Sequence, residues 1–224
     1  MKLSAIIPTF CEASSVGQTV LHCRAFADEV IVADAESPDA TQQNALLAGA
    51  QLVVSRKGRG QQLNAGARAA SGDTLIFVHA DTLLPAAARA ALVGALANPA
   101  IVGGNFKLRF VPSTRAGRFY AAANHYRRRT FGIYYGDSCI FVRSSVFREL
   151  GGFRELALFE DQEFVRRLEA HGRTHYETQV EAATSSRRFA QRPLRTLGLW
   201  ALLQGLYAVG VGPAALARLY AEVR

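Results

Sequence analysis

Short apolar runs alternate with polar, helix-like segments through the first hundred residues of the chain. Four of these runs have the composition of strands: residues 4–7, 30–33, 52–54 and 75–78. Each run stops at a polar or charged turn, and the fourth is followed by His79, Ala80 and Asp81. Buried parallel strands have such continuous apolar runs, and open α/β sheets bind ligands beyond the carboxyl ends of their strands. We therefore expect four strand ends to share one charged edge.

The segments between these runs carry helix signals. We predict helices from Ser14 or Ser15 to Phe26, from Ser37-Pro38 to Ala48, over 61–70, and from Pro85 to about Asn98. Serine followed by proline suits an N-cap and the first helical position. Strands that alternate with helices predict right-handed crossovers and a mostly parallel sheet flanked by helices.

After Pro99 the pattern becomes less regular. Alternating residues predict a half-exposed strand over 101–111, and a basic helix follows over about 114–129. We then expect a strand over 138–142, a short helix closed by Gly151 and Gly152, a helix over 160–170 with Gly172 as its C-cap, and a strand over 175–180. We see no internal repeat and no low-complexity linker.

The length of 224 residues and the apolar content of 50% fit one large α/β domain. We predict that this domain covers residues 1–190, divided into halves at 1–99 and 100–190. Residues 191–224 are expected to form a helical appendage.

Residues 196–217 contain no charged side chain, which raises the question of a membrane. A spanning helix needs about 20 mainly apolar residues, but Gln204, the glycines at 205, 210 and 212, and Pro213 make a continuous span poor. Trp200 and Tyr207, with Arg192, Arg195 and Arg218 nearby, suit a segment that lies at a membrane interface. An ordinary pair of core or dimer helices explains the same pattern equally well.

The formal net charge is +8, which favours anionic partners such as nucleotide phosphates or acidic lipid headgroups. Nucleic acid is disfavoured, because the basic cluster at 127–129 lacks interleaved aromatic residues for base stacking. The three cysteines have no Cys-x-x-Cys spacing, and Pro8 interrupts the only apolar stretch near the N-terminus. We expect a reduced cytoplasmic protein.

Several polar residues at the predicted edge are candidates for ligand binding. Asp34 ends the second strand, where a carboxylate can accept hydrogen bonds from a ribose or base, whereas Ser37 and Asp39 are explained by capping. The turn at 57–60, which contains Lys57 and Arg59, enters a helix and can form an anion site. It has neither P-loop nor dinucleotide-binding spacing, and a solvated basic loop is the alternative.

His79 and Asp81 form a candidate metal site. Hard cations that bridge phosphates prefer oxygen ligands, so Asp81 is the stronger candidate, and His79 suits a borderline ion such as Mn²⁺. Alternatively, His79 orients Asp81 by a hydrogen bond.

Two further groups complete the candidate chemistry. Glu160 and Asp161 open a predicted helix, where either the helix dipole explains them or one of them acts as a general base. Arg187 and Arg188 offer guanidinium groups to a leaving diphosphate, unless they belong to a basic surface loop.

Taken together, these residues resemble a known family. Five signals have the order and approximate spacing of those in GT-A family 2 glycosyltransferases. They are Pro-Thr-Phe-Cys-Glu at 8–12, Asp-x-x-Ser-x-Asp-x-Thr at 34–41, Gly-x-x-x-x-x-Asn-x-Gly at 58–66, the turn at Asp81, and Glu160-Asp161. The resemblance covers residues 3–173. The chain resembles a compact bacterial subgroup of this family, named for its association with radical-SAM and selenium-domain proteins. The resemblance lies in four short motifs: Gly-Arg-Gly, His-Ala-Asp-Thr, Tyr-Gly-Asp and Ser-x-Arg-Arg.

The resemblance implies a GT-A (Rossmann-like) fold whose first half binds the nucleotide and whose second half binds the acceptor. It implies inverting transfer from a nucleotide-sugar, a UDP-sugar above all, to a hydroxyl or carboxyl, assisted by Mg²⁺ or Mn²⁺; a lipid-linked acceptor at the inner face of the membrane is one option. The residues that would bind the donor are Pro8, Thr9, Glu12, Asp34, Lys57, Arg59, Asn64, Asp137, Arg187 and Arg188. Asp81, with His79, would hold the metal, and Asp161 would be the base beside Glu160.

Two departures from the family pattern matter. The usual Asp-x-Asp has become His79-Ala80-Asp81, and Cys11 stands where Asn is common. The Gln-x-x-Arg-Trp motif of processive synthases is matched only loosely, at the last two positions, by residues 185–189, which favours a single transfer. The alternatives are a sugar-nucleotide pyrophosphorylase, which needs a Gly-rich loop where this chain has residues 8–12, and a non-catalytic nucleotide- or lipid-binding module.

Overall fold

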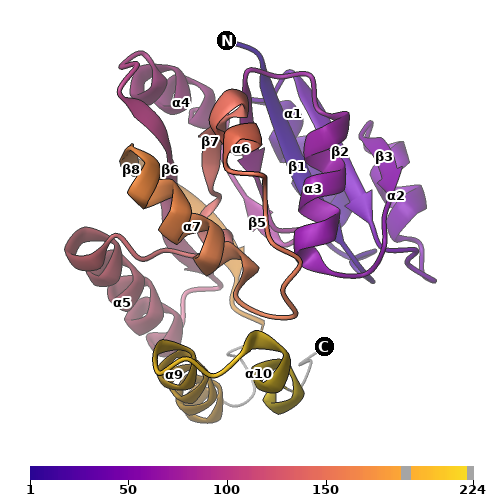
Figure 1. Cartoon of the computed structure of the whole chain (residues 1–224). Helices are drawn as coiled ribbons and strands as arrows, with labels where there is room; N and C mark the ends of the chain where they lie inside the picture. Colours follow the sequence, from indigo (N-terminus) through magenta and orange to yellow (C-terminus); the bar gives the residue numbers. More distant parts are fainter. Residues whose placement is uncertain (188–192, 221–224) are drawn as a thin grey trace.

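The computed structural model describes residues 1–187 and 193–220. One sheet of eight strands, in the order β3-β2-β1-β4-β7-β6-β8-β5, runs through the molecule (Figure 1). The strands are β1 (Leu3–Thr9), β2 (Glu29–Asp34), β3 (Gln51–Val54), β4 (Thr74–Phe77), β5 (Thr82–Leu83), β6 (Ile101–Val111), β7 (Phe141–Arg143) and β8 (Arg173–Ser185). The predicted α/β fold with flanking helices and a C-terminal helical appendage is confirmed.

The first four strands form the parallel part of the sheet. Thr9 pairs with Asp34, and Asp34 pairs with Val54, so three strands end at the same level. β4 lies on the other side of β1, with Ile6 opposite Phe77. The predicted convergence of four strand ends on one edge is therefore confirmed.

Alternate side chains of β1 point into two hydrophobic layers. Leu3, Ala5 and Ile7 are fully buried against α1 (Val16–Arg24), α2 (Thr41–Leu47) and α4 (Ala88–Leu96). Ile6 is buried on the opposite face, against α3 (Arg59–Ala69), α6 (Ser144–Glu149) and α7 (Glu160–His171). A strand turns successive side chains to opposite faces, so helices can cover both sides of the sheet.

The predicted start of α2 was wrong, and the reason lies in Ser37. Its hydroxyl donates to Asp34 Oδ2 at 2.6 Å and accepts from the backbone N of Cys11 at 2.9 Å. Ser37 therefore holds two loops together instead of capping the helix, which begins at Thr41.

The second half mixes parallel and antiparallel pairs. β6 has the predicted bounds and pairs with β8 in parallel and with β7 in antiparallel fashion. A 3-10 helix, η1 (Gly136–Ser138), precedes β7 and shortens it, while β8 extends beyond the predicted 175–180. Gly172 is the C-cap of α7, as predicted, and its backbone is extended because β8 starts directly after it.

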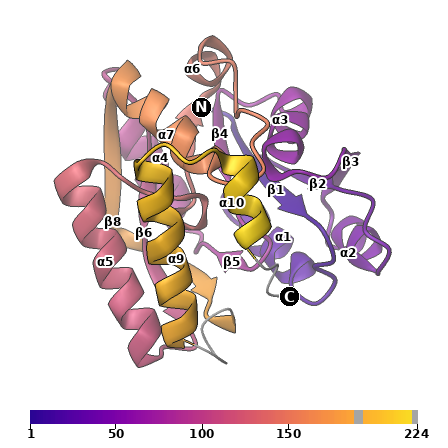
Figure 2. The ribbon, with the colours of Figure 1, turned by 60° about the horizontal axis from the view of Figure 1, so that its bottom comes forward.

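Three helices flank the lower part of the molecule in Figure 1. They are α5 (Arg115–Phe131), α9 (Pro193–Ala208) and α10 (Pro213–Leu219). Figure 2 shows α9 and α10 side by side, and Leu203 of α9, Leu216 of α10 and Phe159 share a small hydrophobic cluster. Within the described part of the chain, no helix is long and apolar enough to cross a membrane. The division at residue 190 stays a prediction.

Candidate active site

The carboxyl ends of β1 and β2 are joined by side chains. Asp34 is fully buried, and its carboxylate accepts from Thr9 Oγ1 at 2.8 Å, from the backbone N and hydroxyl of Ser37, and from Gln42 Nε2 at 2.8 Å. Gln62 from α3 donates its amide to the carbonyl oxygens of Thr9 and Ala33. These contacts fix the end of β1, including Pro8 and Thr9, before any ligand arrives.

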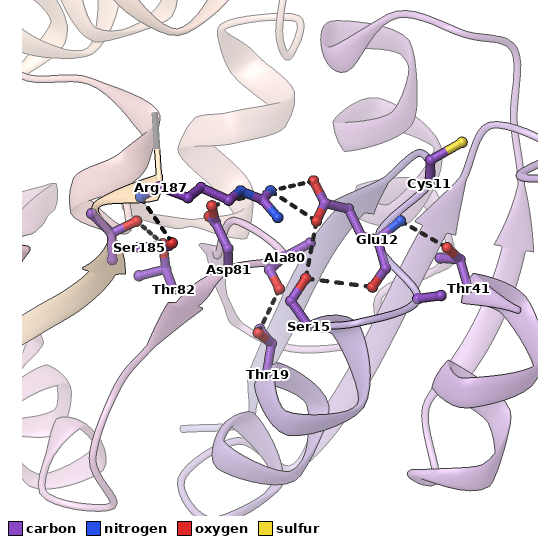
Figure 3. Close-up of polar contacts among 12 residues, drawn as sticks. Cys11, Glu12, Ser15, Thr19, Thr41, Ala80, Asp81, Thr82, Ser185 and Arg187 are labelled. Carbon is purple, nitrogen blue, oxygen red and sulfur yellow. Dashed lines mark hydrogen bonds and ion pairs between the residues drawn. The ribbon is translucent and has the colours of Figure 1, made fainter. Parts of the chain in front are cut away.

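Glu12 follows a turn in which Cys11 has a left-handed backbone, with φ of 56°. The backbone N of Glu12 donates to Thr41 Oγ1 at 2.8 Å, and Ser15 Oγ donates to the Glu12 carboxylate at 2.9 Å. The turn therefore points the Glu12 carboxylate across the sheet edge toward the end of β4, as Figure 3 shows.

Arg187 joins Glu12 to Asp81 across this edge (Figure 3). One guanidinium nitrogen lies 2.7 and 2.9 Å from the two Glu12 carboxylate oxygens and 3.2 Å from Asp81 Oδ2. Arg187 follows β8, whose Ser185 also donates its backbone N to the Asp81 carbonyl at 3.1 Å. Three segments that are remote in sequence thus place two carboxylates around one cation.

His79 lies on the other side of the β4 turn, beside η1. A Cβ atom added to Gly136 would lie 2.8 Å from His79 Nε2 and 3.3 Å from Asp161 Oδ2. The backbone N of Gly136 donates to that Asp161 oxygen at 2.8 Å. Glycine at 136 therefore lets His79 and Asp161 approach the same short loop.

Glu160 and Asp161 begin α7 and are both buried. Asp161 Oδ1 accepts from the backbone N of Gln162 at 2.7 Å, and Glu160 Oε1 lies 3.5 Å from Arg59 Nη1. Burial is the main cause that raises the pKa of Glu160, to about 6; Arg59 lowers it and Asp161 raises it further. Two adjacent acids with different surroundings are suited to different chemical roles.

A cavity of about 150 Å³ opens beside these acids. Its polar wall contains the predicted residues Arg59, His79, Asp81, Asp137, Glu160 and Asp161. Its apolar wall comes from β6, α5, α9 and the loop before α7: Phe110, Tyr120, Leu158, Phe159, Leu197, Trp200 and Ala201. Gln204 of α9 also lines it, and its Nε2 is buried without a hydrogen-bond partner.

Not every predicted residue lies at this cavity. The amide of Asn64 donates to the Phe153 carbonyl and accepts from the Phe153 backbone N, so it fixes the loop after α6. Lys57 Nζ lies 4.3 Å from the centroid of the Phe10 ring, near the end of β1. Arg188 lies outside the described residues.

The sequence pattern did not reveal Gly136, Tyr120, Trp200 and Gln204 as parts of the site. Tyr-Gly-Asp at 135–137 and the single tryptophan were available signals for two of them. Tyr120 and Gln204 carry no local signal, because the packing of α5 and α9 alone brings them to the cavity.

The mixed sheet, with its parallel first half and flanking helices, has the GT-A fold of α/β domains. Residues 4–151 match the family model described as glycosyl transferase family 2. This match covers more than half of the chain, which therefore belongs to glycosyl transferase family 2.

Solved structures share the fold at low sequence identity. S. aureus TarS 1-349, in complex with UDP-GlcNAc, is 18% identical with a TM-score of 0.63; the match covers 82% of this chain and 59% of TarS 1-349. Glucosyl-3-phosphoglycerate synthase from Mycobacterium tuberculosis, in complex with Mn²⁺, UDP and phosphoglyceric acid, is 20% identical with a TM-score of 0.62, covering 94% of this chain and 79% of that one. No curated protein matches the sequence.

Proposed function

We propose that the protein transfers a sugar from a nucleotide-sugar to an acceptor hydroxyl or carboxyl. The observation that carries this proposal is a single cavity lined by Asp81, Glu160 and Asp161, next to the cation held by Glu12 and Asp81. Family membership and two neighbours that bind UDP or a UDP-sugar support the same reaction.

The donor is proposed to lie along the edge formed by β1, β2 and β4. Pro8, Thr9 and Asp34 would face the nucleoside, and Asp137 the sugar. Lys57, Arg59, Arg187 and Arg188 are the cations proposed for the diphosphate, because guanidinium groups can bind its oxygens with two parallel hydrogen bonds. UDP is the favoured nucleotide, since both neighbours were solved with uridine nucleotides.

Asp81 is proposed to hold Mg²⁺ or Mn²⁺, with His79 as a second ligand or as a group that orients Asp81. The fit rests on Arg187, whose guanidinium shows that a positive charge is accommodated between the Asp81 and Glu12 carboxylates. Among the described residues no three His, Cys, Asp or Glu side chains form a metal-binding group. Mg²⁺ is usually held by one or two carboxylates together with substrate phosphates. A bound ion would supply charge stabilisation to the leaving diphosphate.

Asp161 is proposed as the general base of an inverting displacement. The acceptor oxygen forms a bond to the anomeric carbon while the bond from that carbon to the diphosphate breaks. Asp161 takes the hydroxyl proton, and the nucleoside diphosphate leaves with the electron pair. Gly136 and the backbone of Gln162 hold the carboxylate in place. Glu160 is proposed to orient Arg59 and the start of α7.

The acceptor is proposed to have an apolar body next to its reactive oxygen. The cavity has aromatic and aliphatic lining residues besides the acids, and an apolar cavity of about 150 Å³ in another protein holds a benzene ring. Gln204 would donate its unpaired Nε2 to a polar atom of the acceptor. A lipid-linked acceptor fits this wall. We accordingly propose a cytoplasmic protein whose C-terminal segment contacts the inner face of the membrane.

Donor binding tests the proposal most directly. UDP-, GDP- and dTDP-sugars are screened by thermal shift with and without Mn²⁺; a ligand at about 100 times its Kd should stabilise the protein by about 2.7 kcal/mol. Asp81→Ala should abolish the Mn²⁺-dependent part of binding in calorimetry. Asp73→Ala, at the opposite end of β4, is the matched control and should bind normally.

Turnover is followed as release of the nucleoside diphosphate, with and without acceptor. Unchanged Mn²⁺-dependent affinity in Asp81→Ala would show that the metal assignment is wrong. Tight donor binding without any release of nucleoside diphosphate would instead favour a non-catalytic nucleotide-binding module.

A further inference from the structure

The outward face of α5 combines arginines with aromatic side chains. The helix contains five arginines and no acidic residue over its 17 positions. Arg115, Arg118, Phe119, Tyr126 and Arg129 are exposed, and their spacing places them along one side of the helix. An exposed helix face of this composition needs an explanation beyond the folding of the domain.

Two aromatic residues on this face, and a third at the C-terminal end of α5, are unusually open to solvent. Phe119, Tyr126 and Phe131 are 58%, 62% and 63% exposed. Among the described residues, they are the large aromatic side chains that are exposed, and all three belong to α5. The Tyr126 and Phe131 rings pack edge-on with centroids 6.1 Å apart. Aromatic side chains with this exposure are expected where a surface meets a partner.

The inward face of α5 is already used. Arg128 is buried and donates to Asn105 Oδ1 and to Thr174 Oγ1, each at 2.7 Å. Tyr120 and Arg127 line the cavity proposed for the acceptor. The helix is thus anchored to the sheet by one side and presents the other side to solvent as a rigid strip.

Another helix that lines the cavity, besides α5, is α9. Figure 2 shows the two helices running alongside each other. On α9, Arg195 and Leu202 are exposed, the latter by 54%. Both helices therefore line the proposed acceptor site and also carry exposed residues.

We propose that the outward face of α5 docks on an anionic phospholipid bilayer. Its exposed arginines would contact lipid phosphates, and Phe119, Tyr126 and Phe131 would enter the interfacial region, where aromatic side chains are favoured. The inference deepens the proposed function and rests on it for the role of the cavity, because α5 lines that cavity and its docking would bring the cavity near a source of apolar acceptors. The docking surface consists of residues outside the C-terminal segment.

Vesicle binding of the full chain tests this inference without donor or acceptor. Wild-type protein is sedimented with vesicles of phosphatidylglycerol and phosphatidylcholine, or of phosphatidylcholine alone, at low and high salt. Arg115→Gln/Arg118→Gln should lower the partition coefficient on anionic vesicles about 30-fold, since one basic residue near such a surface contributes about 5-fold. Arg148→Gln/Arg166→Gln removes the same charge from exposed positions on α6 and α7 and should bind like the wild type.

A fluorescence measurement locates the contact. Trp200 is the single tryptophan, so Phe119→Trp in a Trp200→Phe background gives one reporter on α5. Brominated lipids should quench this reporter. Leu47→Trp in the same background, at a position 78% exposed on α2, should stay unquenched.

The outcomes separate the inference from the proposals above. Loss of binding in Arg195→Gln/Leu202→Ser, with wild-type binding in the α5 variant, would overturn the α5 surface and leave the C-terminal contact standing. The wild type could instead fail to pellet and sediment as a dimer that Phe119→Ser/Tyr126→Ser dissociates in sedimentation velocity. This result would overturn the inference and show that a second copy covers α5. Absence of transferase activity with normal vesicle binding would count against the proposed function alone.

Discussion

Two acidic regions of this protein are built in opposite ways. At the β1–β2 edge, Asp34 is fully buried, yet its carboxylate accepts hydrogen bonds from Thr9, Ser37 and Gln42. At the start of α7, Glu160 is also buried, but Oε1 has no hydrogen bond and Arg59 is 3.5 Å away. Satisfied buried groups stabilise and fix a structure, whereas a buried carboxylate with few partners costs free energy. The first region is suited to positioning a ligand, and the second keeps a poorly partnered acid, Glu160, beside Asp161, the residue proposed for proton transfer.

Among substitutions that test this comparison, we expect the largest effect, on turnover, from a change at Asp161. Asp161→Asn should lower kcat by about 10²- to 10⁴-fold, the usual contribution of a general base, with nearly unchanged donor affinity. Steady-state kinetics and calorimetry with the donor measure the two quantities separately. Glu160→Gln should be milder. Normal turnover in Asp161→Asn with loss in Glu160→Gln would reverse their roles, and normal turnover in both would direct attention to Asp137.

A smaller effect is expected at Asp34, and it should be on stability. Asp34→Ala removes the acceptor of four hydrogen bonds and leaves the buried hydroxyl of Thr9 and the partly buried amide of Gln42 without it. We expect the free energy of unfolding to fall by about 3 kcal/mol, since each unsatisfied buried group costs about 1–3 kcal/mol. Urea denaturation measures this change. Asp39→Ala, an exposed acid in the same turn, is the control; equal losses in both variants would contradict the distinction.

The smallest effect concerns the pH dependence of stability. The pKa of Glu160 is raised to about 6 from 4.5, so the folded state holds its proton more tightly than the unfolded state. Below pH 4.5 Glu160 is protonated in both states, and its burial carries no free-energy cost for a buried charge. As pH rises from there through about 6, the protein loses stability. Glu160→Gln should raise the free energy of unfolding by about 2 kcal/mol at pH 8, at 1.36 kcal/mol per pKa unit.

The same substitution should change little at pH 4, where Glu160 is protonated in both states. Denaturation curves at the two pH values provide the comparison. A loss of stability at pH 8 would mean that the contact with Arg59 outweighs the cost of burying the carboxylate.

Local patterns predicted the elements well, because strand and helix periods are properties of neighbouring residues. The bounds of β6 and the convergence of β1 to β4 follow from such patterns. The contact between Glu12 and Arg187, across 175 positions, has no local signal, and neither has the position of Gln204 at the cavity. Asn64 has the family spacing but binds the backbone of Phe153, which spacing alone does not reveal. The compact bacterial subgroup stays a prediction.

Because Arg187 bridges Glu12 and Asp81, the carboxylates of the acidic edge already contact a cation before any ligand binds. Glu12 and Asp81 already share one positive charge, the guanidinium of Arg187, so an arriving cation must compete with this side chain for their carboxylates. The apparent binding free energy of any cation at Asp81 is then its own interaction free energy with the carboxylates minus that of the Arg187 guanidinium it displaces. A guanidinium that is displaced from the carboxylates can then bind an anion. Binding of a cation at Asp81 would therefore favour binding of an anion by Arg187.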